Sequence, residues 1–263
     1  MDYKFIIVKR KDHITLIRIN RSEVRNAINA HVSFELENAF DAFEDDSNAW
    51  IAIITGVGDK AFSAGADLKW AATASEEEKR EAYKKLKYQA SGLTGNYRIT
   101  KPIIAAVNGY AYGGGFELAL SCDIIIAAEH AKFCMPEPIV GRVPVDGGIH
   151  RLVRQIPYHL AMEILFTRNV ISAQEGLKLG FVNKVVPLDQ LIAEAEKMAN
   201  IIMEGSPLAI RAIKQMANDG LETTLRKANS TLFPFYRKFT QSHDFIEGPK
   251  AFSEKRKPIW KGI

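Results

Sequence analysis

The sequence predicts an α/β fold followed by a helical C-terminal region. Up to about residue 187, short apolar runs of strand length alternate with stretches of helical periodicity. Beyond that residue only helical patterns follow, and no internal repeat or low-complexity linker is visible. The chain has 263 residues, 47% of them hydrophobic and 25% charged, which is enough to bury an ordinary globular core. We therefore expect a core over residues 1–187 and a helical region over residues 188–263.

The N-terminal third of the chain contains strand and helix patterns in alternation. Residues 5–8 and 14–19 run or alternate apolar, and they predict a pair of strands. Apolar residues within 32–43 recur at helical spacing and predict an amphipathic helix. Residues 50–55 predict a third strand, and the charged, helix-favouring residues 75–97 predict an exposed helix. The apolar positions of the amphipathic pattern are Val32, Leu36, Ala39, Phe40 and Phe43.

The centre of the chain combines two short apolar runs with a group of glycines. The run at 103–107 has strand length and ends at the turn dipeptide Asn108-Gly109. Glycines 113–115 allow the backbone to turn sharply or to approach another segment closely. Residues 116–122 then predict a helix of about two turns, and residues 124–128 predict a second buried strand.

Helix signals dominate the remainder of the chain. Residues 159–166 are predicted as helix from their apolar pattern. Ser172 and Glu175 have the spacing of a capping box, which opens a further helix. Ser206 is a good N-cap residue followed by proline, and it is expected to begin a helix over residues 208–217.

Composition excludes several classes of protein. No apolar run approaches the roughly 20 residues that span a bilayer, and the first residues show no secretory signal. Cys122 and Cys134 belong to no metal-binding or redox motif, so we expect buried thiols, no metal and a cytoplasmic location. The net charge of +4 comes from scattered basic residues. Scattered basic residues are typical of a solvated surface or of a protein that binds an anionic small molecule, rather than of a nucleic-acid-binding protein.

One segment imitates a dinucleotide-binding motif. Residues 56–61 match GxGxxA directly after a predicted strand. Residues 62–65 interrupt the helix that should follow, however, and no acidic residue ends a strand about 20 residues later. The glycines at 113–115 lack the Lys-Ser or Lys-Thr of a phosphate-binding loop, and no Gly-x-Ser-x-Gly motif is present. Nucleotide binding and serine-hydrolase chemistry are therefore disfavoured.

Two glycine-flanked segments are the best candidates for chemistry. Residues 63–69 and 113–117 each follow a predicted strand and open onto a predicted helix, so each can direct a backbone N–H outward. Two such donors that converge on a carbonyl oxygen would form an oxyanion hole, each contributing roughly 3 kcal/mol to a transition state. Glu117 lies in the first turn of the second helix, where it either stabilises the helix dipole or takes part in catalysis.

These segments resemble the signatures of the crotonase superfamily, also called the enoyl-CoA hydratase/isomerase superfamily. The similarity extends over nearly the whole chain in consistent order and spacing. The resemblance implies a spiral of repeated ββα units, with C-terminal helices over 188–263 that mediate trimerisation and cover the pocket. It also implies a homotrimer or a dimer of trimers. The matching stretches are DKAFSAGADLK (59–69), KPIIAAVNGYAYGGGFELALSCDIIIAAEHAKF (101–133), PEPIVG with GG (136–148) and ISAQEGLKLGFVNKVVP (171–187).

The resemblance also implies roles for individual residues. By position, the backbone N–H groups of Ala66 and Gly114 would hold the oxygen of a CoA thioester. Glu117 and Glu137 match the two glutamates of members that add water to a 2-enoyl thioester. Such a reaction needs one group to activate water and one to protonate C2, and paired carboxyls in a dry pocket differ in proton affinity. We expect Glu117 to activate water and Glu137 to transfer the proton at C2.

Further contacts to the CoA part of the substrate are implied around the first segment, and no separate cofactor is implied. Each has an ordinary structural alternative: Asp67 can cap the helix that it begins, and the two lysines can be surface residues. Glu137 can be an exposed turn acid. The implied CoA and substrate contacts are Lys60, Ala64, Ala66, Asp67, Leu68, Lys69 and Gly114.

Residues 113–120 and 246–262 are similar to one subgroup in particular, the carnitinyl-CoA dehydratases, also called crotonobetainyl-CoA hydratases. A quaternary ammonium substrate would require an aromatic or acidic cage. Asp146 stands one position later than the aspartate that isomerase-like members use, so a structural role is favoured while isomerase chemistry stays open. A core or surface role is the favoured expectation for each of the available aromatic residues, which are Trp70, Tyr83, Tyr88, Tyr97 and Phe116.

Two rival classes remain open beside hydration. One is another enzyme of the same fold, either an enoyl-CoA isomerase or a CoA-thioester hydrolase. The other is a non-catalytic family member that binds nucleic acid or a protein partner, which the basic charge balance permits. Retention of both glutamates argues against the second class.

Overall fold

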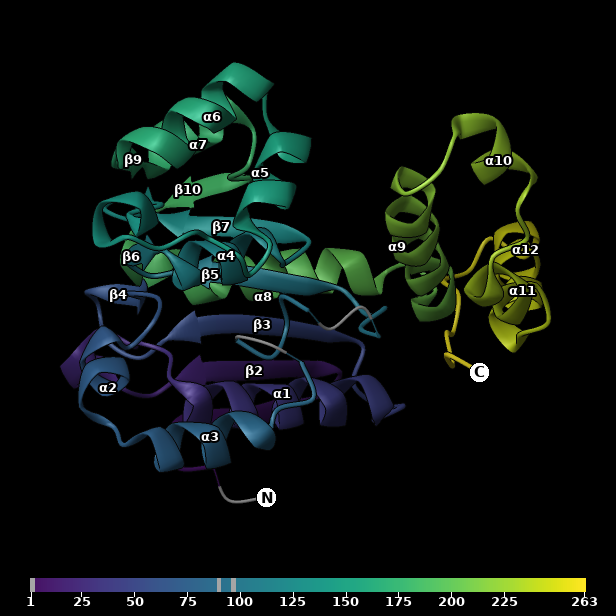
Figure 1. Cartoon of the computed structure of the whole chain (residues 1–263). Coiled ribbons are helices and arrows are strands. Elements are labelled where there is room, and N and C mark those ends of the chain that lie inside the picture. Colours follow the sequence, from purple (N-terminus) through teal and green to yellow (C-terminus); the bar gives the residue numbers. More distant parts are fainter. Residues whose placement is uncertain (1–2, 89–90, 96–97) are drawn as a thin grey trace.

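Two β-sheets form the centre of the computed structural model, which describes residues 3–88, 91–95 and 98–263 (Figure 1). The large sheet contains, in spatial order, β1 (Ile6–Lys11), β2 (Ile14–Ile19), β3 (Ile51–Gly56), β5 (Ile103–Val107), β7 (Ile124–Ala128) and β10 (Lys184–Val186). The small sheet contains β4 (Ala61–Ser63), β6 (Tyr110–Tyr112), β8 (Lys132–Cys134) and β9 (Ile171–Ser172). The predicted strands at 14–19, 103–107 and 124–128 have the observed bounds.

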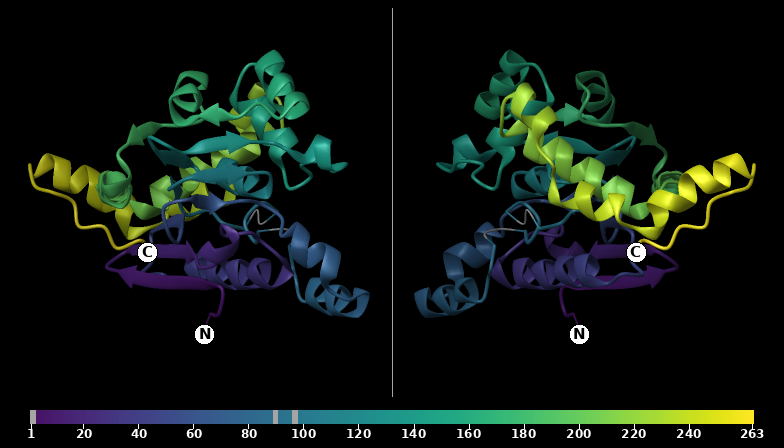
Figure 2. Two further views of the ribbon diagram at one scale, coloured as in Figure 1. Left: turned by 90° about the vertical axis from the view of Figure 1, so that its left-hand side faces the viewer. Right: turned by 90° about the vertical axis from the view of Figure 1, so that its right-hand side faces the viewer.

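The strands form a spiral in which each turn contributes to both sheets. β3, β5 and β7 pair in parallel in the large sheet, and each is followed directly by β4, β6 or β8, which pair in parallel in the small sheet. Among the strands of the described residues, only β1–β2 and β8–β9 pair antiparallel. The turns stack in sequence order, from the N-terminal strands to β10 (Figures 1 and 2). This is the spiral of ββα units that the resemblance implies.

The helices surround these sheets, and their ends follow local capping chemistry. The side chains of Asn29, Ser172 and Ser206 accept N–H bonds at the starts of α1, α7 and α9, and the predicted capping box is present. The helices are α1 (Ala30–Asp45), α2 (Leu68–Thr73), α3 (Glu76–Lys84), α4 (Gly114–Leu120), α5 (Gly148–Gln155), α6 (Tyr158–Thr167), α7 (Ala173–Leu179), α8 (Leu191–Met203), α9 (Pro207–Leu221), α10 (Leu225–Ser230), α11 (Pro234–Thr240) and α12 (His243–Ser253). Short 3₁₀ helices are η1 (Ser22–Val24), η2 (Glu137–Val140) and η3 (Leu188–Gln190).

The hydrophobic core lies between the large sheet and the helices that cover it. Every residue of β3 and β5 is buried, as expected for strands that pack on both faces. The five apolar positions predicted on one face of α1 are all buried. Phe116, Phe133 and Phe181 pack together with ring centroids 5.1–5.2 Å apart, and they fill the space between α4 and the small sheet.

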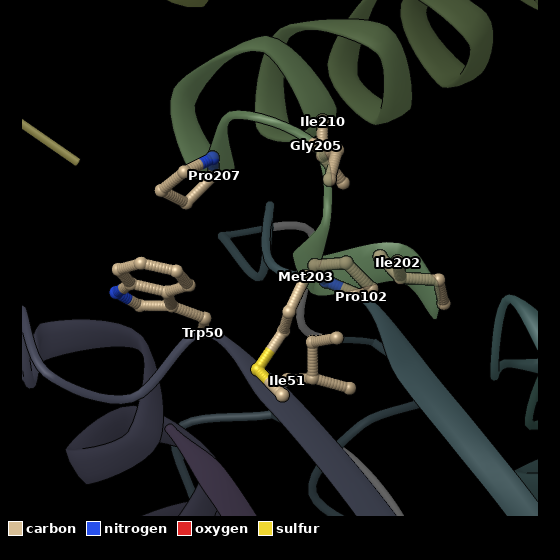
Figure 3. Close-up of a pocket in the computed structure, with 8 residues that line it drawn as sticks. All are labelled: Trp50, Ile51, Pro102, Ile202, Met203, Gly205, Pro207 and Ile210. Atoms are coloured by element: carbon tan, nitrogen blue, oxygen red, sulfur yellow. The ribbon is translucent and has the colours of Figure 1, made fainter. Parts of the chain in front are cut away.

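After β10, the described chain contains only helices and their connections. α8 packs across the large sheet, whereas α9–α12 extend away from it (Figures 1 and 2). A small apolar pocket lies at the joint between α8 and α9, and the rings of Trp50 and Pro207 face each other across it (Figure 3). None of the candidate catalytic residues lines this pocket. The division into two regions at residue 187 stays a prediction. No helix in the described ranges has the length and apolar content needed to cross a bilayer.

The helix expected over residues 75–97 is shorter than predicted. α3 ends at Lys84, and the described residues beyond it form turns. The backbone N–H groups of Lys87 and Tyr88 donate to the Glu37 carboxylate of α1, so tertiary contacts replace the helical bonds. Tyr97, which the sequence suggested as an aromatic contact, lies outside the described residues.

Replacing Gly115 with alanine is expected to lower the free energy of unfolding. A Cβ on Gly115 would lie 2.2 Å from the carbonyl oxygen of Ser63, so two backbone segments must separate to admit it. We expect a loss of about 2 kcal/mol or more, as for other overpacked sites. Gly220→Ala is the matched control, because its Cβ would meet Ala228 at an ordinary 3.7 Å. Urea unfolding at one protein concentration measures the free energy of unfolding of both variants. Equal stabilities of the two variants would contradict the close packing of Gly115 on Ser63.

Candidate active site

The segment between β4 and α2 engages its backbone N–H groups with one exception. The N–H groups of Ala64, Gly65 and Asp67 donate to oxygens of the surrounding chain at 3.0, 3.1 and 2.9 Å. Among the described residues, the N–H of Ala66 has no acceptor, and Ala66 is exposed. Ala66 therefore presents a free backbone donor just before a helix.

The first turn of α4 places a second free donor beside Ala66. Gly113 donates its N–H to Cys134 O at 2.9 Å, whereas the N–H of Gly114 meets no acceptor in the described parts of the chain. A Cβ on Gly65 would lie 2.8 Å from the Gly114 nitrogen, and a Cβ on Gly114 would lie 3.8 Å from the Ala66 nitrogen. The two free N–H groups thus belong to backbone segments in direct contact. Such a pair can stabilise an oxygen that gains negative charge.

Two buried asparagines fix the backbone that carries the first donor. Asn26 Nδ2 donates to Ala61 O at 2.7 Å, and Asn108 Nδ2 donates to Gly58 O at 2.7 Å. Ser63 Oγ in turn donates to Asn26 O at 2.8 Å. These bonds connect successive turns of the spiral. Asn108 belongs to the predicted turn dipeptide, but its side-chain role was missed because the partners lie about 50 residues away.

Glu117 is buried in α4, and backbone N–H groups donate to its carboxyl group. It is 2% exposed, and the N–H of Gly148 donates to its Oε1 at 2.8 Å. Burial raises the pKa of Glu117 to about 8, outweighing this hydrogen bond, and the negative charges of Asp146 and Glu137 act in the same direction. Glu117 can therefore keep a proton near neutral pH. The contribution of Gly148 was not predicted from the sequence, although its glycine pair belongs to the matched motif.

Glu137 lies in η2 and faces the glycine turn from the other side. It is partly buried rather than an exposed turn acid. Gly113 has a φ of 52°, and a Cβ there would lie 2.6 Å from Glu137 Oε1, so this carboxyl needs a glycine opposite it. Its Oε2 is buried and has no hydrogen-bond partner among the described residues. Burial raises the pKa of Glu137, and the charge of Asp146 raises it further.

A third carboxyl group, that of Asp146, lies at the same place. A Cβ on Gly114 would lie 3.9 Å from Asp146 Oδ2. Asp146 immediately precedes the Gly147-Gly148 turn whose N–H binds Glu117, and burial raises the pKa of its carboxyl group. The sequence favoured a structural role for this residue, yet its carboxyl lies beside the free donors.

The site therefore combines two unpaired N–H groups with three carboxyl groups of raised pKa. The charge of Asp146 raises the pKa of both glutamates, and the charge of Glu137 raises the pKa of Glu117. Within the described residues, no set of three His, Cys, Asp or Glu side chains has the arrangement of a metal site. The arrangement can exchange protons with a substrate whose carbonyl oxygen is held by the two donors.

The residues expected to contact CoA differ in how exposed their side chains are and in whether those side chains already have partners. The Asp67 carboxylate caps α2 through the Trp70 N–H at 3.0 Å and pairs with Arg21 at 2.9 Å, so its side chain is already engaged. The capping alternative for Asp67 is thus confirmed. Ala64 is partly buried, whereas Lys60, Leu68 and Lys69 are exposed. Their contacts with CoA stay a prediction.

Three of the aromatic candidates, Phe116, Trp70 and Tyr83, are engaged in packing contacts. Phe116 is fully buried and packs in the core, which is one of the roles that the sequence favoured for it. Trp70 packs edge-to-face on Tyr83, with ring centroids 6.0 Å apart, and on His31 at 5.9 Å. The Trp70 Nε1–H donates to Glu78 at 3.0 Å. These rings contact one another instead of surrounding an open space.

Comparison with known proteins gives consistent matches over almost the full length. A family model described as Enoyl-CoA hydratase/isomerase matches residues 9–263. A carnitinyl-CoA dehydratase of Salmonella typhi is 41% identical over 257 residues, covering 96% of this chain and 97% of that protein. The crystal structure of an enoyl-CoA hydratase from Mycobacterium tuberculosis H37Rv superposes with a TM-score of 0.90 and 35% identity, covering 98% and 99% of the two chains. An enoyl-CoA hydratase from Bacillus anthracis gives a TM-score of 0.90, 35% identity and coverage of 99% and 100%.

Proposed function

The chain belongs to the enoyl-CoA hydratase/isomerase family, and we propose that it is a hydro-lyase that reversibly adds water across the double bond of a 2-enoyl-CoA thioester. Its family and relatives mark it as an enzyme of the lyase type. The observation that carries the proposal is the position of Glu117 and Glu137 beside two free backbone N–H groups. Those are the groups that water addition to a conjugated thioester requires.

The free N–H groups of Ala66 and Gly114 are assigned to the thioester oxygen. When water attacks C3, the electron pair of the double bond moves toward the carbonyl, and the oxygen becomes an enolate. Two fixed donors stabilise that charge more than they stabilise the neutral thioester, which is the condition for accelerating the step. Each donor is expected to contribute roughly 3 kcal/mol.

The two glutamates are assigned complementary proton transfers. In hydration, the Glu117 carboxylate takes a proton from the attacking water as the C3–O bond forms. The Glu137 carboxylic acid then gives its proton to C2, so the pair begins and ends the step with one proton in total. Dehydration uses the reverse protonation, in which Glu117 is protonated and Glu137 is ionised. The deeper burial of Glu117 favours this second form at rest.

The acyl substrate is proposed to be crotonobetainyl-CoA or carnitinyl-CoA, because a relative that is 41% identical is a carnitinyl-CoA dehydratase. CoA is assigned to the segment that contains Lys60, Ala64, Asp67, Leu68 and Lys69. We assign the protein to the cytoplasm, as in the sequence-based expectation, within fatty acid and carnitine metabolism.

A homotrimer or a dimer of trimers is proposed as the assembly. Large apolar side chains remain exposed on the C-terminal helices and their connections, and contacts between subunits would cover them. They include Leu221, Leu225, Ile246 and Phe252, whose exposures are 69%, 76%, 69% and 87%. This supports an assembly role for the region over residues 188–263.

Double-bond isomerisation is the second candidate function. The third carboxyl, Asp146, favours it because an additional proton carrier beside the acyl chain can serve another carbon. The mass of the product distinguishes the candidates: hydration adds the mass of one water, whereas isomerisation leaves the mass unchanged. Thioester hydrolysis would release free CoA, and a non-catalytic binding protein would give no product.

Removing either glutamate's ability to exchange a proton is expected to reduce hydration strongly. We expect Glu117→Gln and Glu137→Gln each to lower kcat for crotonyl-CoA hydration by at least about a hundredfold. Loss of the conjugated thioester absorbance measures the rate, and circular dichroism controls for folding. Near-full rates in both variants would refute the assigned mechanism.

Removing the Gly114 N–H is expected to reduce transition-state stabilisation. Proline is compatible with the first position of a helix and lacks the donor, so Gly114→Pro should lower kcat about a hundredfold or more. Gly114→Ala is the matched control, because it adds a Cβ at distances of 3.7 Å or more but retains the N–H. If the proline and alanine variants turn over at the same rate, the Gly114 N–H does not hold the oxygen.

The shared proton predicts a falling rate on the alkaline side. The active form of the Glu117–Glu137 pair carries one proton. Because the raised pKa of Glu117 is about 8, the pair loses this proton as pH rises through about 8, and kcat/KM should decline. Initial rates across this range measure the profile, after subtraction of spontaneous thioester hydrolysis. A rate that rises through pH 8 instead would mean that ionised Glu117 acts alone.

A further inference from the structure

Among the described residues, the carboxyl group of Asp146 has no positively charged partner. In the described parts of the chain, it takes part in no hydrogen bond or ion pair, and burial is the only influence that shifts its pKa. The nearby Arg151 guanidinium donates to backbone oxygens, those of Asp146 at 3.4 Å and Thr94 at 2.8 Å. A partly buried acid without a partner costs free energy that a ligand can offset.

The same lack of positive charge extends to the other acids of the site. None of the groups that shift the pKa of Glu137 is a lysine, arginine or histidine, and one buried oxygen of Glu137 is unpaired. An uncharged acyl chain would leave these carboxyls in a drier and more repulsive environment. An acyl chain with a fixed positive charge would relieve the repulsion between the carboxyls. The site would therefore bind such a chain more tightly than an uncharged one.

Asp146 also lies close to one of the two backbone donors that are assigned to the thioester oxygen. Its Oδ2 lies 3.9 Å from the Cβ position of Gly114, one of the two residues with free N–H groups. In an acyl chain with nitrogen on its fourth carbon, that nitrogen lies roughly 6 Å from the thioester oxygen by ordinary bond lengths. Three of the aromatic candidates are engaged elsewhere, since Phe116 is in the core and Trp70 packs on Tyr83 and His31.

We propose that Asp146 is a specificity-determining residue, whose carboxylate binds a quaternary ammonium group on the fourth carbon of the acyl chain. The inference rests on the proposed function, because it assumes that the acyl-CoA occupies this site. It assigns recognition of the cationic group to a carboxylate rather than to an aromatic cage. Asp146 is separate from the two glutamates assigned to proton transfer.

Binding of an unreactive pair of ligands tests this role without depending on catalysis. The probes are a saturated four-carbon acyl-CoA that ends in a trimethylammonium group and its uncharged isostere, in which carbon replaces the nitrogen. Calorimetry gives both Kd values for the wild type, for Asp146→Asn and for Asp189→Asn. Asp189 is an exposed acid in η3, so its variant removes the same charge away from the site.

The wild type is expected to bind the cationic probe more tightly than the isostere. Asp146→Asn should reduce this preference about tenfold, as expected for a partly buried charge pair, while Asp189→Asn should preserve it. The proposal is overturned if the wild type shows no preference or if Asp146→Asn preserves it within twofold. Failure to hydrate crotonyl-CoA would instead refute the proposed function, and the ratio of Kd values would still decide the role of Asp146.

Discussion

The close contact between two stretches of backbone is the constraint on which the rest of the site depends. Gly115 packs against the carbonyl of Ser63, and Gly65 packs against the carbonyl of Tyr112, at distances that leave no room for a side chain. Because each spiral turn delivers a short strand beside the preceding one, the ends of β4 and β6 meet at this point. The contact brings two free N–H groups together and fixes the start of α4, which carries Glu117.

The electrostatics of the acids follow from where this contact places them. Glu117 is buried, and the charges of Glu137 and Asp146 act on it without a compensating positive charge from the described residues. Such a cluster lowers the stability of the fold, since desolvated carboxyls without partners are unfavourable. The same burial raises the pKa of Glu117, so that its carboxyl group keeps a proton at neutral pH and can transfer it to a substrate. Stability and reactivity therefore oppose each other at one place.

Local patterns in the sequence predict the parts of the fold that depend on local chemistry. The apolar strands, the buried face of α1 and the capping box at Ser172 are of this kind. The three-residue strands β4 and β6 were not predicted, because neighbouring spiral turns rather than their own residues define them. α3 ends early because Glu37, a distant residue in sequence, binds the backbone beyond it. The spiral repeats backbone geometry and not residues, so no internal repeat is visible.

The sequence pattern alone marks the two glycine-flanked segments and Glu117 as candidates for chemistry. The individual roles of Ala66, Gly114, Glu117 and Glu137 come only from the resemblance, because periodicity assigns none of them a partner. The position of Asp146 depends on a loop that no pattern describes. The most direct test of the account is hydration of crotonyl-CoA in D₂O enriched in oxygen-18, with the product analysed by mass spectrometry and NMR. The account predicts one heavy oxygen on C3, one deuterium on C2 and an intact thioester. Deuterium on C4 without oxygen, or heavy oxygen in a free carboxylate, would contradict it.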